Sequence, residues 1–258
     1  MTGLLASVTS AAEAEIALAA GADIIDLKDP RSGALGALPA PAIRDAVEAI
    51  AGRRTVSATA GDLPMQPQAV AAAVAGIARL GVDIVKVGFF PGGDPDACIA
   101  ALADEILRGA RIVAVLFADQ APDTQLIGHL QAAGFTGAML DTADKRAGGL
   151  RRHIEDGALG AFVDDVRRHG MISGLAGSLT LADIPPLLQL RPDYLGFRSA
   201  LCAAGRGSEL DAGRMTTVRA AMDHQESAAR MATDAAGAQR AAHSLVGGSP
   251  SIRSAKSR

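Results

Sequence analysis

The segment from Ala22 to Pro30 reads ADIIDLKDP, a mostly apolar run that ends in charged residues and a turn. Such a run predicts a buried strand, and Asp29-Pro30 predicts a loop directly after it. Side chains alternate along a strand, so Asp26 and Lys28 point to the same face at its end. A lysine placed there either stays charged and binds a phosphate, or loses its proton and attacks a carbonyl. The alternative is an ion pair between the two neighbours with only a structural role.

The pattern of this segment, a strand followed by a loop and a helix, recurs along the chain. We expect strands at residues 3–8, 22–28, 55–60, 83–89, 111–118, 137–142, 171–176 and 193–199. We expect helices at about 11–20, 41–51, 67–80, before 108, 124–133, 158–169, after 180 and 211–222. Eight alternating units imply a parallel sheet and favour a closed TIM (β/α)8 barrel. The open doubly wound fold would carry a glycine fingerprint after its first strand, and Ser7-Val8-Thr9-Ser10 lacks it.

The alternating pattern stops near Asp223. We therefore predict a catalytic barrel domain over residues 1–222 and an Ala/Ser/Gly-rich tail over residues 223–258. Nothing in the pattern of the tail gives it a face to bury, so it is predicted to be partly helical or disordered.

Composition narrows the class of protein. The chain has 258 residues, of which 49% are hydrophobic and 3% aromatic, so the core must be aliphatic. The net charge is -3 without a basic stripe, which gives no support for nucleic-acid binding. Cys98 and Cys202 are far apart, which argues against a disulfide framework or a zinc site and fits a reducing compartment. No leader or long apolar run is evident, so we expect a cytoplasmic protein without membrane contact.

Three lysines are predicted to meet at one end of the barrel. Lys28, Lys86 and Lys145 lie at or just beyond strands two, four and six. Side chains from alternate strands share layers inside such a barrel, and active sites lie at the carboxyl ends of the strands. Mutual repulsion and burial lower lysine pKa values, as a Schiff-base nucleophile requires, while Asp26 and Asp141 offset part of the charge. A buried ion-pair network without any reaction is the alternative.

Polar residues at other strand ends are candidates for substrate binding. Ser57, Thr59 and Asp62 end the third strand. Barrels often bind phosphate between the loops after strands seven and eight, where backbone N–H groups are available. The candidates for this phosphate site are Gly177, Ser178, Arg198 and Ser199. The five histidines have no metal-ligand spacing, and we expect no metal and no cofactor.

Five ordered motifs make the resemblance to one family specific. They are DLKDP at 26–30 with GALGA at 33–37, SATAGD at 57–62, VKVG at 85–88, MLDTA at 139–143 with Lys145, and LAGSL at 175–179. Over residues 3–220 the chain resembles the (5-formylfuran-3-yl)methyl phosphate synthases. Asp29 departs from the pattern, since family members often have Asn there.

The resemblance implies a barrel lyase that condenses two molecules of glyceraldehyde 3-phosphate, with loss of one phosphate and water. Its product supplies the furan of methanofuran-type one-carbon carriers. Lys28 resembles the family's Schiff-base lysine and Lys86 its proton acceptor. Asp26, Asp141 and Lys145 match other polar positions of its active site.

Two alternatives to this function remain open. The first is a different enzyme on the same barrel, either another class I aldolase or a relative of orotidine-phosphate decarboxylase. Asp26-Leu27-Lys28 also resembles the array of orotidine-phosphate decarboxylase relatives, in which charge near a leaving carboxylate drives the reaction without an imine. The second alternative is a sensor that binds a sugar phosphate without turnover, because one barrel hosts many functions. Barrels of this kind often pair through helical faces, so we also expect a homo-oligomer.

Overall fold

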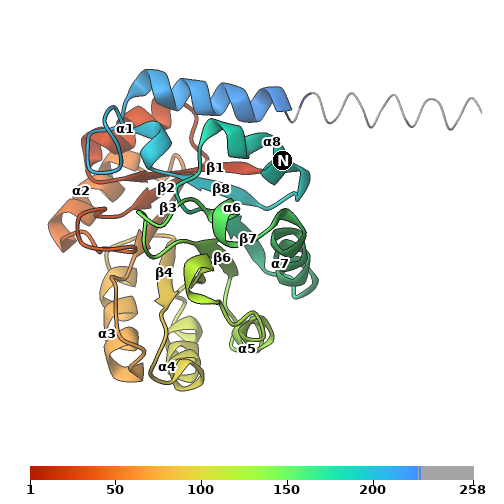
Figure 1. Ribbon diagram of the computed structural model, residues 1–258. Coiled ribbons are helices and arrows are strands. Elements are labelled where there is room, and N and C mark those ends of the chain that lie inside the picture. The colour runs from red at the N-terminus through yellow and green to blue at the C-terminus, as the bar shows by residue number, and fades with distance from the viewer. Residues whose placement is uncertain (226, 228–258) are drawn as a thin grey trace, which may run out of the picture.

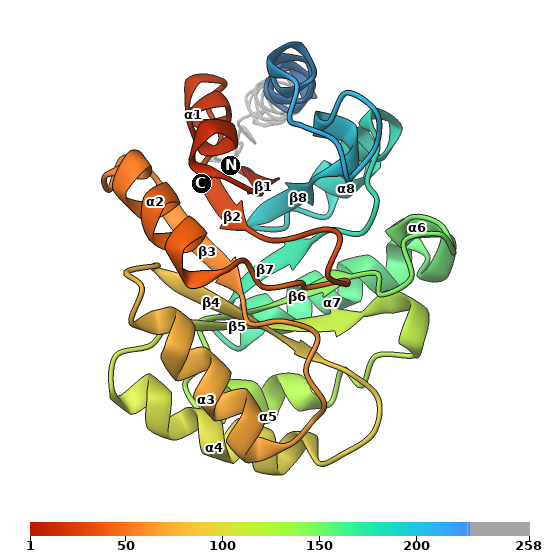
Figure 2. The ribbon, with the colours of Figure 1, turned by 90° about the vertical axis from the view of Figure 1, so that its left-hand side faces the viewer.

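The computed structural model describes residues 1–225 and 227 of the chain. Eight parallel strands form a closed barrel in chain order, from β1 through β8, and β8 pairs with β1. Helices surround the barrel in both views (Figure 1; Figure 2). This is the (β/α)8 fold that the alternating pattern predicted. The proposed tail lies outside the described residues, except that 223–225 and 227 continue the last helix.

The strands differ from the expected ranges by one or two residues at most of their ends. They are β1 (Gly3–Val8), β2 (Ile24–Leu27), β3 (Thr55–Thr59), β4 (Ile84–Phe89), β5 (Ile112–Phe117), β6 (Gly137–Asp141), β7 (Ile172–Leu175) and β8 (Tyr194–Phe197). Three short 3-10 helices lie in the connections: η1 (Ala118–Gln120), η2 (Leu181–Asp183) and η3 (Ser199–Leu201).

The helices also follow the expected order, with one addition. They are α1 (Ala11–Ala19), α2 (Ala40–Ile50), α3 (Pro67–Ala78), α4 (Pro95–Leu107), α5 (Leu126–Ala132), α6 (Leu150–His153), α7 (Asp156–Arg168), α8 (Ile184–Gln189) and a final helix from residue 212. The four-residue α6 was not predicted, because one helical turn is too short to show a hydrophobic period. None of the described helices is long and apolar enough to cross a membrane.

Local sequence explains where several helices begin and end. The Ser10 hydroxyl accepts the Glu13 N–H at 3.2 Å, and the Asp94 carboxylate accepts the Ala97 N–H at 2.9 Å, so both residues act as N-caps. Prolines occupy the first turn of α2, α3, α4 and α8, where no helical N–H partner is lost. Gly21 adopts a φ of 79° just past α1, a conformation that a residue with a Cβ atom disfavours.

Aspartates fix the register at the opposite end of the barrel from the predicted site. Each precedes a strand and accepts a backbone N–H from the start of the neighbouring strand. The pairs are Asp23 with Leu4, Asp83 with Val56, and Asp193 with Ser173, each at 2.7 Å. These bonds satisfy N–H groups that would otherwise lack a ladder partner.

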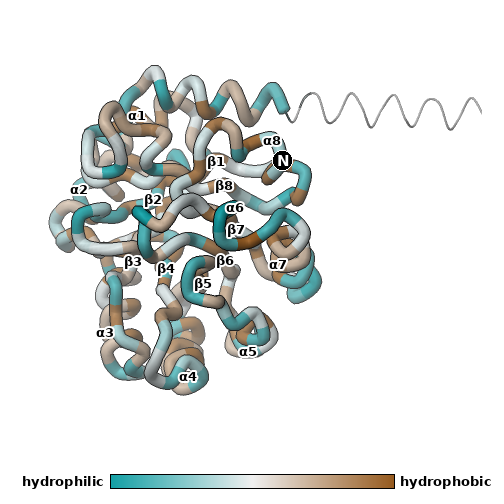
Figure 3. The backbone as a smooth tube through the Cα atoms, viewed as in Figure 1, coloured by the Kyte–Doolittle hydropathy of each residue, from teal (hydrophilic) through white to brown (hydrophobic). Residues whose placement is uncertain are grey.

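The core has two layers, and both are mainly aliphatic. The larger cluster lies between the strands and the surrounding helices, and the smaller one fills the barrel interior. In Figure 3 hydrophilic residues gather on the outer side of α7 and in loops. The Tyr194 ring fills the interior beside Gly174, where an added Cβ would lie 2.3 Å from a ring carbon. The interior is therefore largely filled by side chains, and a pocket opens at the carboxyl ends of the strands.

Candidate active site

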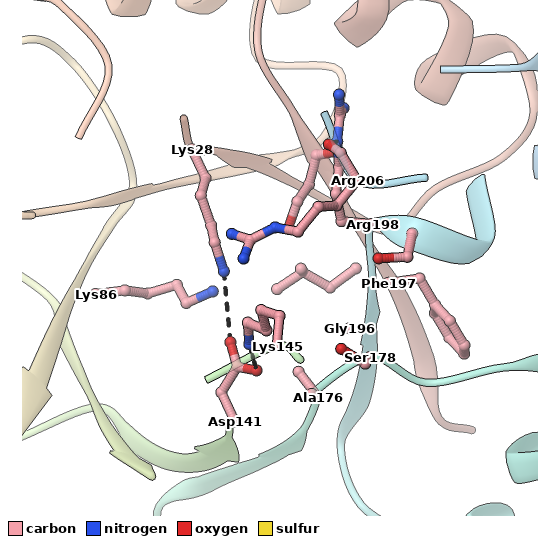
Figure 4. Close-up of a pocket in the computed structure, with 14 residues that line it drawn as sticks. Lys28, Lys86, Asp141, Lys145, Ala176, Ser178, Gly196, Phe197, Arg198 and Arg206 are labelled. Atoms are coloured by element: carbon pink, nitrogen blue, oxygen red, sulfur yellow. Dashed lines mark hydrogen bonds and ion pairs between the residues drawn. The ribbon is translucent and has the colours of Figure 1, made fainter. Parts of the chain in front are cut away.

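A pocket opens at the carboxyl ends of the strands, and the three predicted lysines line it. Figure 4 shows the amino groups of Lys28, Lys86 and Lys145 pointing into one space beside Asp141. The convergence expected from their alternate strands is confirmed. These are three of the four lysines in the whole sequence, and the fourth, Lys256, lies outside the described residues. Because arginine supplies most other cations of this chain, the clustering suggests a task that needs an amine able to lose its proton.

Lys86 and Asp26 form a fully buried ion pair. Lys86 Nζ lies 3.0 Å from Asp26 Oδ2, and the two side chains are 3% and 0% exposed. The hydroxyl groups of Ser7 and Ser57 also donate to the Asp26 carboxylate, at 2.9 and 2.7 Å. Burial raises the pKa of the Asp26 carboxyl, but the charges of Lys86 and Lys28 and the bond from Ser57 outweigh burial and lower it. Asp26 is therefore held as a carboxylate.

Lys28 and Lys145 share the second carboxylate. Lys28 Nζ lies 3.4 Å from Asp141 Oδ2, and the Lys145 amino group binds the other oxygen, Oδ1. Lys145 also donates to the Thr142 hydroxyl at 3.2 Å. Burial raises the pKa of Asp141, yet the charges of Lys145 and Lys28 lower it well below its ordinary range. The structure does not show an ion pair between the neighbours Asp26 and Lys28. Asp26 pairs with Lys86 on β4, and Lys28 pairs with Asp141 on β6.

The amine of Lys28 has a pKa well below that of an ordinary lysine. Burial lowers its pKa from the ordinary 10.5 to about 8, a shift that Asp141 opposes and that Lys145 and Lys86 reinforce. With a pKa of about 8, roughly a tenth of the amine is neutral at pH 7, whereas an ordinary lysine is almost wholly charged. A neutral amine is the nucleophile that attacks an aldehyde, so Lys28 is suited to form an imine.

Three of the predicted substrate-binding residues support the pocket without lining it. Ser57 donates to Asp26, as described, and the Thr59 hydroxyl donates to the Gly36 carbonyl at 2.9 Å. Asp62 accepts the N–H groups of Ala34 and Leu35 at 2.8 and 2.6 Å. Thr59 and Asp62 therefore hold the loop between β2 and α2, which begins directly after Lys28.

The predicted phosphate-binding residues do line the pocket, but Arg198 is already fully bonded. Gly177 and Ser178 adopt φ values of 111° and 48° in the turn after β7, and Ser199 follows β8. A positive φ at a residue other than glycine is uncommon and is often found at functional sites. The five N–H groups of Arg198 donate to Glu13 Oε1 and Oε2 and to the carbonyls of Ser7, Arg206 and Ser208. Arg198 thus has no donor left for a phosphate in this arrangement.

Sequence reasoning missed three residues of the site. Ser7 supports Asp26 from β1, the strand that pairs with β2, and a small residue inside an apolar strand gave no signal. Glu13 was detectable, because Ser10-x-x-Glu13 matches a helix capping box. Its carboxylate instead binds the N–H and hydroxyl of Thr9 as well as Arg198. Arg206 lines the pocket from the loop after η3, where no periodic pattern exists to place it.

Within residues 1–225 and 227, no group of three or more His, Cys, Asp and Glu side chains is arranged to hold a metal ion. The polar groups in and around the pocket are instead three amines, two carboxylates, hydroxyls and two guanidinium groups. This set suits an anionic substrate with a carbonyl group, because amines and guanidinium bind phosphate and a neutral amine attacks carbonyl carbon.

The fold and the pocket together define a (β/α)8 barrel enzyme with a cluster of buried lysines. The chain belongs to the 4-HFC-P synthase family, whose model matches residues 4–219. A protein of Methylorubrum extorquens, to which (5-formylfuran-3-yl)methyl phosphate synthase activity is provisionally attributed, is 46% identical over 220 residues, 85% of this chain and 91% of that protein. The (5-formylfuran-3-yl)methyl phosphate synthase of Methanopyrus kandleri is 37% identical over 214 residues, 78% of this chain and 90% of that one.

Solved structures with a similar fold are much more distant in sequence. The 3-hexulose-6-phosphate synthase of Salmonella typhimurium matches with a TM-score of 0.60 at 19% identity, over 87% of this chain and 100% of that one. Phosphoribosyl anthranilate isomerase from Thermus thermophilus matches with a TM-score of 0.60 at 16% identity, over 87% and 99%. At these identities the likeness establishes the barrel fold alone.

Proposed function

We propose that this enzyme condenses two molecules of glyceraldehyde 3-phosphate to (5-formylfuran-3-yl)methyl phosphate through a Schiff base on Lys28. The observation that carries the proposal is the Lys28 amine, buried beside Asp141 with a pKa of about 8. Membership of the family adds support, because the named relatives are synthases of this product. The product would supply the furan of a methanofuran-type one-carbon carrier.

The proposed reaction begins with imine formation. Neutral Lys28 attacks the aldehyde carbon of the first substrate, and the Lys86 ammonium donates its proton as water leaves and the protonated imine forms. Lys86, in its neutral form, then removes the proton from the neighbouring carbon, and the electron pair of that bond becomes an enamine. Asp26, 3.0 Å from Lys86 Nζ, stabilises the ammonium that results. The proton transfer thus uses a base whose carboxylate partner is already in place.

Bond formation and elimination complete the proposed sequence. The enamine carbon attacks the aldehyde of the second substrate, forming a branched six-carbon skeleton still attached to Lys28 as an imine. The ring then closes, and hydrolysis of the imine releases Lys28. The whole reaction loses one phosphate and two molecules of water, and it needs no oxidant or reductant. Asp141 and Lys145, which bind each other beside Lys28, are placed to transfer protons during the eliminations.

The turn at Gly177 and Ser178, with Ser199, is proposed as one phosphate site. These residues line the pocket after β7 and β8, where barrels of this class often bind phosphate. The full bonding of Arg198 argues against its direct participation. Arg198 is better described as a residue that positions the loop after β8.

Mass spectrometry after treatment with glyceraldehyde 3-phosphate and borohydride tests the proposal. We expect a reduced adduct on the peptide that contains Lys28 and release of furan product without borohydride. Lys28→Met should abolish both, while Arg31→Gln, a change at an exposed residue of the same loop, should retain both. Few lysines compete for labelling, because the sequence contains only four.

The same experiment separates the alternatives. Product formation with an unmodified Lys28 would overturn the nucleophile assignment and direct attention to Lys86 or Lys145. Absence of both adduct and product in the wild-type protein would overturn the proposal, and would favour imine-free barrel chemistry or binding without turnover.

A further inference from the structure

Arg206 is a pocket residue to which the reaction above gives no role. It lies in the loop between η3 and the final helix, is half-buried, and lines the same pocket as the three lysines. Among residues 1–225 and 227, its side chain forms one hydrogen bond, from Nη2 to the Gly33 carbonyl at 2.9 Å. Figure 4 shows Arg206 and Arg198 on the same side of the pocket, to the right of Lys28. The Arg206 guanidinium therefore lies close to the predicted imine with most of its donors unused by the described residues.

The two arginines of the pocket differ in their partners. Arg198 is neutralised by Glu13 and bonded through all five N–H groups. No carboxylate of residues 1–225 or 227 forms an ion pair with Arg206. Burial lowers the pKa of the Arg206 guanidinium, although arginine remains charged at neutral pH. Asp141 and Asp62 oppose this shift from beyond ion-pair distance without cancelling it. A half-buried cation that no carboxylate contacts directly is costly, and a bound anion would offset that cost.

The charge of the pocket indicates the kind of anion. Arg198 also lines the pocket, but Glu13 neutralises it. The other four cations, Lys28, Lys86, Lys145 and Arg206, face two carboxylates, Asp26 and Asp141, so the ionised pocket carries a net charge of +2. A phosphate monoester carries a charge of about -1.5 to -2 at pH 7. The planar fork of arginine also matches two phosphate oxygens at once, which an ammonium group cannot do.

The loop that carries Arg206 is braced in place. Arg198 binds the carbonyls of Arg206 and Ser208, at 2.9 and 2.7 Å. The Ala204 N–H donates to the Ser208 hydroxyl at 2.8 Å, and Cys202 pairs with Leu210 across the base of the loop. The Glu13–Arg198 pair thus presents the Arg206 side chain towards the loop that follows Lys28.

We infer that Arg206 binds the phosphate of the aldehyde that forms the imine with Lys28, an inference that rests on the function proposed above. Its bond to Gly33 joins it to the loop that begins just after Lys28, so its donors lie near the carbon chain of a substrate attached there. The phosphate replaces the Gly33 carbonyl as the partner of the guanidinium. The turn at Gly177 and Ser178 then remains for the phosphate of the second aldehyde.

Competing aldehydes test this assignment. The rate of borohydride trapping on Lys28 is measured with glyceraldehyde 3-phosphate and with glyceraldehyde, and the ratio of the two rates gives the preference for phosphate. The ratio cancels any change in the Lys28 pKa, which affects both aldehydes equally. We expect Arg206→Gln to lower the ratio about 10- to 100-fold, the range for a lost charged hydrogen bond, and Arg206→Lys to lower it less. Arg31→Gln, the exposed neighbour, should leave the ratio unchanged.

The outcomes separate the inference from the proposed function. An unchanged ratio in Arg206→Gln would overturn the inference while leaving the Lys28 imine intact. No trapping of either aldehyde by the wild-type protein would instead overturn the function. In that case inorganic phosphate is the probe, and we expect it to raise the melting temperature of the wild-type protein more than that of Arg206→Gln, which keeps only the site at Gly177 and Ser178. Equal stabilisation of both proteins would remove Arg206 as an anion ligand.

Discussion

Lys28 Nζ lies 3.4 Å from Asp141 Oδ2, and both side chains are almost completely buried. The two residues are 113 positions apart in the chain and meet because β2 and β6 contribute side chains to the same end of the barrel. The carboxylate keeps the Lys28 pKa from falling further, while burial and two neighbouring amines hold it near 8. The reactivity of Lys28 is therefore set by a balance of opposing charges.

The first prediction concerns the pH dependence of imine formation. The neutral amine increases about tenfold per pH unit below the Lys28 pKa, so the trapping rate should rise from pH 6 and level off above about pH 8. Borohydride trapping at constant aldehyde concentration measures this profile. A profile that keeps rising to pH 10 would mean that Lys28 titrates as an ordinary lysine.

The second prediction is that two substitutions move this profile in opposite directions. Asp141→Asn removes the charge that raises the Lys28 pKa, so the midpoint should move below 8. Lys145→Met removes a charge that lowers it, so the midpoint should move above 8. Asp144→Asn is the control, because the exposed Asp144 pairs with Arg146 and lies outside the pocket lining. Shifts in the same direction for both pocket variants would contradict the charge balance.

The third prediction is a gain in stability on losing the nucleophile. The Lys28 pKa is lower in the folded state than in the unfolded chain, so the lysine destabilises the fold below about pH 8, and this penalty disappears as pH rises towards 10.5. Lys28→Met should therefore raise the free energy of unfolding by about 1–3 kcal/mol at pH 7. Asp141 keeps Lys145 as a partner in this variant.

Urea denaturation at pH 7 and pH 10 checks this third prediction. The difference in free energy of unfolding between Lys28→Met and the wild-type protein should be smaller at pH 10, because the wild-type amine is then neutral in the folded protein. A variant less stable than wild type at pH 7 would show that the Lys28–Asp141 contact outweighs the burial of the amine.

The fourth prediction concerns the buried pair Glu13–Arg198, whose side chains are 7% and 9% exposed. Removing one partner leaves the other charge buried, so Glu13→Gln and Arg198→Met should each cost about 3–5 kcal/mol of folding free energy. The double variant should cost clearly less than their sum. The exposed pair Arg167–Asp164 on α7 is the matched control, and its coupling should stay below about 1 kcal/mol. Additive losses at Glu13 and Arg198 would contradict this account.

The fifth prediction tests whether Asp62 positions a loop. Asp62→Ala leaves the N–H groups of Ala34 and Leu35 without their carboxylate partner, so the loop after Lys28 should open more often. Trypsin should then cleave faster after the exposed Arg31, by about tenfold. Asp94→Ala, which removes a similar bond at the start of α4, serves as the control. Unchanged cleavage, together with weaker phosphate binding, would restore Asp62 to the substrate-binding role predicted from sequence.

Much of the fold was predictable because its signals are local. Apolar runs of strand length, capping residues and glycines after helices each act within a few residues, and they located the eight units. The α6 turn escaped because a single turn has no period. The same alternation of side chains placed Lys28, Lys86 and Asp141 at strand ends, which is where the pocket lies. The motif at 57–62 was found as well, but its residues hold Asp26 and a loop instead of lining the pocket.

The sequence by itself determined the repeating unit, the closed barrel and the set of lysines, because periodicity and residue type are properties of short segments. The tertiary structure decided the partners: Asp26 with Lys86, 60 residues away, Lys28 with Asp141, and Arg198 with Glu13, 185 residues away. Those pairings depend on the stagger and closure of the barrel, which bring distant strand ends together. Charge balance in the pocket, and with it the pKa of Lys28, follows from the pairing and burial that only the folded chain creates.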